Sequence, residues 1–188
     1  MKAFSNLLSD LILTSSRNRK LSLLAQYFSS TPDPDRGYAL AALTGSLNFN
    51  NIKASFFKDL IKEKQDEHLF DLSYDYVGDL AETISLLWDQ EKSGNMPRLS
   101  SLFENLKKAK NDELKNHIIN ILNISTADQR WAFIKLFTGG LRIGVSSRLV
   151  KQGLANYGNV DLEEIEKIWH GLHFPYINLF SWLENKGS

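Results

Sequence analysis

The segment from Thr138 to Ser146 combines residue types that suit contact with phosphate, and it reads Thr-Gly-Gly-Leu-Arg-Ile-Gly-Val-Ser. Its three glycines allow tight turns and a close approach of the backbone to another surface. The guanidinium of Arg142 can donate paired hydrogen bonds to a phosphate or enter a minor groove. The helix expected after this segment has free N–H groups at its N-terminus, and Arg148 and Lys151 extend the positive surface. Taken alone, the segment also fits a plain glycine-capped turn between two helices with a solvated arginine.

A second basic group, Arg17-Asn18-Arg19-Lys20, follows Ser15 and Ser16, which are natural caps for a helix that begins there. Positive side chains at a helix N-terminus oppose the helix dipole, at a cost of about a few tenths of a kcal/mol. That placement suggests another use, such as binding an incoming phosphate. A looser third group consists of Lys107, Lys108, Lys110 and Lys115. Three separate basic turns on one body would suit a long anionic ligand.

The composition and the absence of other motifs exclude several classes of protein. The 188 residues include 22 Lys and Arg against 22 Asp and Glu and contain no cysteine, so a strongly basic body, a disulfide framework and thiolate metal ligands are excluded. His170 and His173 have no carboxylate at ligand spacing, and GxxxxGK, GxGxxG and serine-hydrolase motifs are absent. We therefore predict no metal site and no catalytic residue. The acidic residues between Asp66 and Glu82 are interpreted as solvated faces and helix N-terminal charges.

Apolar residues recur at helical spacing along the whole chain, and none of the apolar sets alternates with a period of two. The first predicted stripe consists of Phe4, Leu7, Leu8, Leu11 and Ile12. A later one consists of Leu69, Leu72, Ser73, Tyr76 and Val77, after which Asp79 is expected to cap the next helix. The pattern predicts an all-α fold, a single compact domain of roughly ten to twelve short helices, with a soft boundary near residues 89–97. No apolar run reaches the roughly 18 residues needed to span a bilayer, and no signal peptide is evident, so we expect a cytoplasmic protein.

Several stretches together resemble the N-terminal DNA-binding domain of ATP-dependent DNA ligases, most closely the bacterial multi-domain type. They are Phe4 to Phe28 with its Thr14-Ser15-Ser16 and Lys20 turn, Ala42-Leu43-Thr44-Gly45, Tyr76 to Ile84, Leu136 to Ser146, Leu149-Val150, and the region from Trp169 to Pro175. Their order and separation fit one family across nearly the whole chain. The resemblance therefore identifies residues 1–188 as a DNA ligase N-terminal DNA-binding domain.

The resemblance implies an all-helical domain that lies along the minor groove on both sides of a nick. Such a domain binds nicked duplex DNA without sequence preference, through its loops and helix N-termini, in an enzyme that seals nicks during DNA replication, repair and recombination. The DNA-binding residues expected by similarity are Gly139, Gly140, Leu141, Arg142, Gly144, Val145, Ser146 and Arg148, together with Ser16, Arg17, Asn18 and Lys20. Asp79 is instead assigned a capping and packing role, because a carboxylate facing phosphate would be unfavourable.

The Lys-x-Asp-Gly motif, whose lysine takes AMP from ATP in such ligases, does not occur in this sequence. The adenylation and OB-fold domains of the family are also absent from the chain. We therefore expect this chain to bind DNA as a monomer without catalysing, and we expect ATP and Mg²⁺ to belong only to the missing catalytic domains. The competing hypothesis is a helical protein-interaction module, with plain connecting glycine turns and negligible affinity for DNA.

Overall fold

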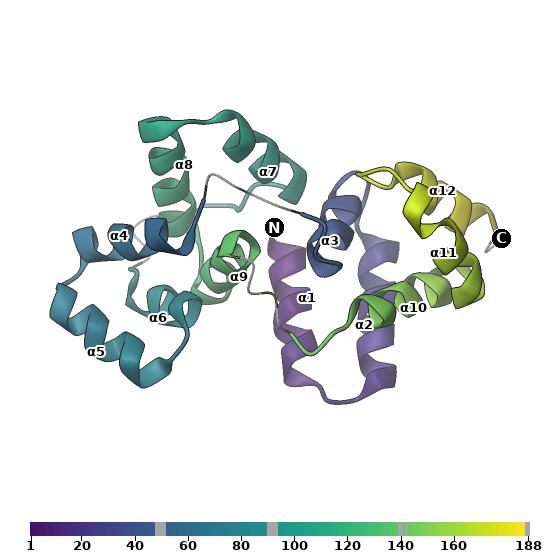
Figure 1. Ribbon diagram of the computed structural model, residues 1–188, viewed down its shortest axis with the longest axis horizontal. Helices are drawn as coiled ribbons and strands as arrows, with labels where there is room; N and C mark the ends of the chain where they lie inside the picture. Colours follow the sequence, from purple (N-terminus) through teal and green to yellow (C-terminus); the bar gives the residue numbers. More distant parts are fainter. Residues whose placement is uncertain (48–51, 90–93, 139–140, 142, 187–188) are drawn as a thin grey trace. The chain divides into compact units, whose positions relative to one another are not determined.

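A computed structural model describes the whole chain except residues 48–51, 90–93, 139, 140, 142, 187 and 188. The helices are α1 (Lys2–Leu13), α2 (Arg17–Ser30), α3 (Asp35–Leu43), α4 (Ala54–Lys64), α5 (Glu67–Val77), α6 (Leu80–Leu87), α7 (Leu99–Lys108), α8 (Asn111–Ile124), α9 (Ala127–Thr138), α10 (Ser147–Gly158), α11 (Leu162–Ile168) and α12 (Ile177–Lys186), with a short 3₁₀ helix η1 (Trp169–Gly171) before the last (Figure 1). The described residues contain no strand. The all-α prediction of ten to twelve helices is confirmed.

The chain divides into two compact units, each of which is discontinuous in sequence. Unit 1 comprises Met1–Ser5 and Asn48–Gly140, and unit 2 comprises Asn6–Leu47 and Leu141–Ser188. The loop at 89–97, which we expected to be a soft boundary, lies within unit 1 instead. Polar contacts on either side explain this difference. The buried Trp88 donates from its indole to Asn123 Oδ1 at 2.9 Å, and the amino group of Met1 donates to the carbonyl of Pro97 at 3.2 Å.

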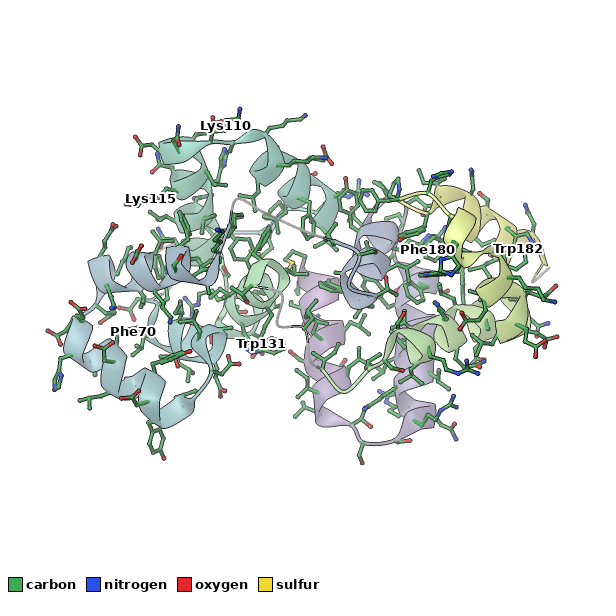
Figure 2. The ribbon with its side chains drawn as sticks, in the orientation of Figure 1. Phe70, Lys110, Lys115, Trp131, Phe180 and Trp182 are labelled. Carbon is green, nitrogen blue, oxygen red and sulfur yellow. The ribbon has the colours of Figure 1, made fainter. Side chains whose placement is uncertain are left out.

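Unit 1 is built around aromatic side chains of α4, α7 and α9. Phe133 of α9 lies 6.2 Å from Phe57 and 4.9 Å from Phe137, measured between ring centroids, and Phe137 lies 5.4 Å from Phe103. All four side chains are buried. Such tilted and edge-to-face pairs are the geometry that aromatic rings prefer. Helix α5 joins this unit with only one buried residue, Phe70, which Figure 2 labels.

Asp79 caps α6, as predicted, and it also pairs with a lysine of α9. Its Oδ1 accepts a hydrogen bond from the Glu82 amide at 2.8 Å, and its Oδ2 accepts one from Lys135 Nζ. Burial acts to raise the pKa of Asp79, but the Lys135 ammonium and the Glu82 amide outweigh it and hold that pKa below its ordinary value. The cap and the ion pair therefore both favour the charged carboxylate.

The Asp79→Ala variant is expected to lower the free energy of unfolding by about 1–2 kcal/mol, because it removes a cap and a partly buried ion pair. Asp79→Asn should lose less, since its amide oxygen can still cap the helix. A lowered carboxylate pKa stabilises the fold above the ordinary pKa of the group, and that contribution is lost as pH falls through the folded pKa. Urea denaturation at pH 7 and pH 3 measures both effects. Equal losses for the two variants at neutral pH would contradict the capping role.

In unit 2, α2 and α10 pack closely against each other (Figure 1). Gly153 of α10 faces Leu24 of α2, and a Cβ atom at position 153 would lie only 2.9 Å from the Leu24 Cβ. Real Cβ atoms essentially never come so close. The absence of a side chain at Gly153 thus permits the close approach of the two helices that carry the predicted DNA-binding turns.

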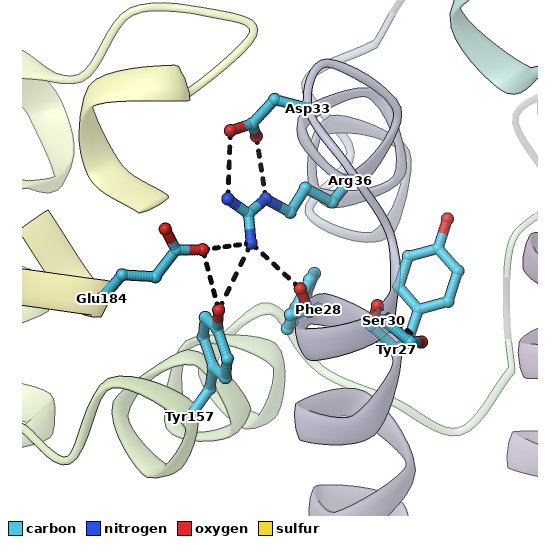
Figure 3. Close-up of polar contacts among 7 residues, drawn as sticks. All are labelled: Tyr27, Phe28, Ser30, Asp33, Arg36, Tyr157 and Glu184. Atoms are coloured by element: carbon cyan, nitrogen blue, oxygen red, sulfur yellow. Dashed lines mark hydrogen bonds and ion pairs between the residues drawn. The ribbon is translucent and has the colours of Figure 1, made fainter. Parts of the chain in front are cut away.

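A buried arginine connects the remaining parts of unit 2 (Figure 3). Arg36 donates from Nε to Asp33 Oδ1 at 2.8 Å and from Nη2 to Asp33 Oδ2 at 3.0 Å, a bidentate pair. Its Nη1 donates to the carbonyl of Phe28 at 3.1 Å and lies 2.7 Å from Glu184 Oε1. The guanidinium carbon lies 4.2 Å from the ring centroid of Phe180, which Figure 2 labels. One side chain thereby links α2, the turn before α3, and α12.

Candidate nucleic-acid interface

The N-terminus of α2 is formed as the sequence predicts, with Ser16 as its cap. Ser16 has an extended backbone, and its Oγ accepts a hydrogen bond from the Arg19 amide at 3.2 Å. The amide of Ser16 itself donates to Thr14 Oγ1 at 3.3 Å. Residues Ser15 to Arg19 are exposed, so the positive charges of the first turn face solvent. A capped, exposed helix N-terminus with basic side chains favours anions over cations.

The N-terminus of α10 has the same construction. Ser146 caps the helix, and its Oγ accepts a hydrogen bond from the Leu149 amide at 3.1 Å. Before it, Gly144 takes a φ of 69°, a left-handed conformation that favours glycine. That turn directs the chain from the glycine-arginine segment into α10.

A single hydrogen bond joins these two helix starts. Lys20 Nζ, on α2, donates to the carbonyl oxygen of Gly144 at 2.8 Å across 124 positions of sequence. The two turns border one open hollow of about 610 Å³ in unit 2. Its lining residues are Ser15, Arg17, Lys20, Leu141, Ile143, Gly144, Val145, Ser146 and Leu149. The hollow therefore combines two helix N-termini, two cations and an apolar wall.

The structure brings half of the twelve residues that were predicted to bind DNA together around the hollow. Arg17, Lys20, Leu141, Gly144, Val145 and Ser146 line the hollow. Ser16, Asn18 and Arg148 are exposed on the same two helix starts without being part of the lining. Gly139, Gly140 and Arg142 lie outside the described residues.

Three lining residues, Ser15, Ile143 and Leu149, were not predicted as site residues. Ser15 was considered only as a cap, and the two apolar residues carry no signal of phosphate binding. A usable signal existed for Leu149, because it follows the capping Ser146 by three positions, at the end of the first helical turn.

The basic side chains near the hollow differ in whether an acidic side chain already pairs with them. Lys151 donates to Glu166 at 3.1 Å and lies 4.6 Å from the ring centroid of Trp169, so it does not extend the positive surface as the sequence suggested. Arg148 stays largely exposed, with its Nη1 3.9 Å from Glu166. Among the described residues no carboxylate lines the hollow. Of the residues that the structure describes, Arg17 and Lys20 therefore supply the positive charge of its wall.

The third basic group lies apart in sequence, in unit 1. Lys107, Lys108 and Lys110 are exposed, whereas Lys115 donates to Glu63 at 3.0 Å; Figure 2 labels Lys110 and Lys115.

Within the described ranges, the histidines and carboxylates form no group of three that could hold a metal ion. Nor does the described part of the chain include a helix with the length and apolar character required to cross a membrane.

A comparison with known protein families agrees with the resemblance that the sequence motifs indicated. The family model described as "DNA ligase N terminus" matches residues 1–155, which include every residue that lines the hollow. No curated protein matches the chain. A family match over most of the chain shows membership, and the chain therefore belongs to the DNA ligase N-terminal family, as a DNA-binding domain of a DNA ligase.

Proposed function

We propose that this chain binds nicked duplex DNA without sequence preference, as the DNA-binding domain of an ATP-dependent ligase that seals nicks. The observation that carries the proposal is the pairing of two capped helix N-termini with Arg17 and Lys20 around one open hollow. Backbone amides at a helix start and basic side chains both bind phosphate oxygens. Two helix N-termini and two basic side chains around one hollow suit consecutive phosphates of one strand.

The chemistry of the hollow explains the expected lack of sequence preference. Phosphate contacts fix where a protein lies on DNA but carry no information about the bases. The apolar wall of Leu141, Val145 and Leu149 offers no hydrogen-bonding group to a base edge. Both features favour binding through the sugar-phosphate backbone, and the family resemblance adds contacts in the minor groove.

Catalysis belongs in this proposal to other domains of the parent enzyme, because the Lys-x-Asp-Gly lysine that would accept AMP is absent from the chain. We propose that the chain alone forms no adenylate and binds neither ATP nor Mg²⁺ appreciably, and that it acts as a monomer. Calorimetric titration with ATP and Mg²⁺ should give no heat of binding, and tight uptake of ATP would contradict the proposal.

The test is fluorescence anisotropy of a labelled nicked duplex and its intact counterpart, titrated with the chain at several salt concentrations. If about four to eight phosphates are neutralised, log affinity should fall with log salt at a slope of about −4 to −7. The Arg17→Ala, Lys20→Ala double variant should reduce the size of that slope by about two and weaken binding by about tenfold or more at low salt.

The matched control is the Lys107→Ala, Lys108→Ala double variant, which removes the same charge from the exposed end of α7. It should bind more tightly than the Arg17, Lys20 variant and keep a steeper salt dependence. Equal weakening by both pairs would contradict the assignment of the hollow. No binding by the unmodified chain even at low salt would contradict the proposed function and favour a protein-interaction module.

A further inference from the structure

Two apolar residues at the end of α1, Ile12 and Leu13, are exposed, and they lie close in sequence to Ser15 of the hollow. Leu13 is 85% exposed and Ile12 is 47% exposed, whereas Leu8 and Leu11 of the same helix are fully buried. Leu13 stands two positions before Ser15, which lines the hollow, so their Cα atoms are at most about 7 Å apart. An isolated exposed leucine is ordinary, but this one adjoins a surface that suits phosphate.

The chemistry of a nucleic-acid strand specifies what such a leucine would contact. Each phosphate in the backbone is joined on both sides to a sugar, and the deoxyribose ring presents carbon-bound hydrogens to its surroundings. A strand whose phosphate occupies the hollow has a sugar within a few ångströms of that phosphate. We propose that Leu13 packs against the deoxyribose next to the phosphate held by Arg17 and Lys20; this inference rests on the proposed function.

The contact distinguishes DNA from RNA. An apolar side chain pressed against the C2′ edge of a sugar tolerates hydrogen there, but it deprives a 2′-hydroxyl of water without offering a hydrogen-bond partner. Leu13 therefore acts as a specificity-determining residue that favours deoxyribose, while the cations of the hollow bind phosphate from either polymer. Its contribution is apolar, so it is independent of salt.

The test compares the unmodified chain with Leu13→Ser on a DNA duplex and an RNA duplex of the same sequence, at two salt concentrations. Leu13→Ser should weaken binding to DNA by about three- to tenfold, from loss of buried apolar area. Its salt slope should equal that of the unmodified chain, and its affinity for RNA should hold or rise, because a serine hydroxyl can pair with a 2′-hydroxyl. The preference for DNA over RNA should therefore shrink by at least the same factor.

Leu86→Ser is the matched control, because Leu86 is 64% exposed on α6, a helix of unit 1. The Leu86→Ser chain should bind DNA as the unmodified chain does. A Leu13→Ser chain that binds DNA as tightly as the unmodified one, or weakens on both duplexes equally, overturns the inference alone. In that case the Arg17, Lys20 variant still reports on the proposed function. Absence of DNA binding by the unmodified chain overturns both.

Discussion

The Arg36→Met variant is expected to lose about 2–4 kcal/mol of its free energy of unfolding. The substitution keeps a long side chain but removes a buried guanidinium from Asp33, Glu184 and the Phe28 carbonyl. Breaking a buried ion pair from one side costs about 3–5 kcal/mol, and the partial exposure of both carboxylates reduces that loss. Urea denaturation followed by circular dichroism measures the change.

Arg19→Met is the control, since Arg19 is exposed on α2 of the same unit, and it should shift stability by less than about 0.5 kcal/mol.

The pH dependence of the free energy of unfolding gives a second readout. The Arg36 guanidinium, followed by the Tyr157 hydroxyl, lowers the pKa of Glu184. The stabilisation is therefore present above the ordinary pKa of a glutamate and is lost as pH falls through the folded pKa. An Arg36→Met chain that keeps this acid sensitivity unchanged would contradict the network.

The second large effect is expected for Gly37→Ala, which should destabilise the protein by more than about 3 kcal/mol. Gly37 lies buried in α3 against the turn that contains Pro175, and a Cβ at position 37 would overlap the carbonyl oxygen of Pro175 and lie 2.7 Å from its carbon. Backbone atoms cannot turn aside as a flexible side chain can, so the α3 contact must open. Thermal unfolding measures the loss.

Gly171→Ala provides the comparison, because a Cβ at position 171 would meet nothing within 4 Å. Its melting temperature should stay within a few degrees of that of the unmodified chain. Similar melting temperatures for the two alanine variants would show that the turn at Pro175 moves aside at little cost. That result would contradict the expected loss of stability from the overlap.

Helical periodicity predicted the existence of the helices better than the side on which each one packs. In α5 the predicted stripe was wrong: Leu69, Leu72 and Tyr76 are exposed, and Phe70 is the buried residue. That helix carries two apolar sets on neighbouring faces, and only the packing against α4 and α6 decides between them. Ile12 was likewise predicted in the stripe of α1 but is half-exposed, because the stripe ends at Leu11.

The candidate site was predictable where its signals are local. Serine caps and clustered basic residues are visible in a short window of sequence, and both helix starts were found that way. The contact between Lys20 and the Gly144 carbonyl was not predictable, because no local rule pairs residues 124 positions apart. The same holds for the ion pair between Arg36 and Glu184, which are also far apart in the sequence.

The discontinuity of unit 2 has a consequence for the order of events during translation. Residues 6–47 are made early, and their partners from position 141 onward follow only after residues 48–140 of unit 1 have been made. Domains generally fold as units while synthesis proceeds, at about 5–20 residues per second. The nascent α1 and α2 therefore wait about 5–25 seconds for α10. Until then the hollow between the starts of α2 and α10 does not exist, so a half-made chain cannot engage a ligand through it.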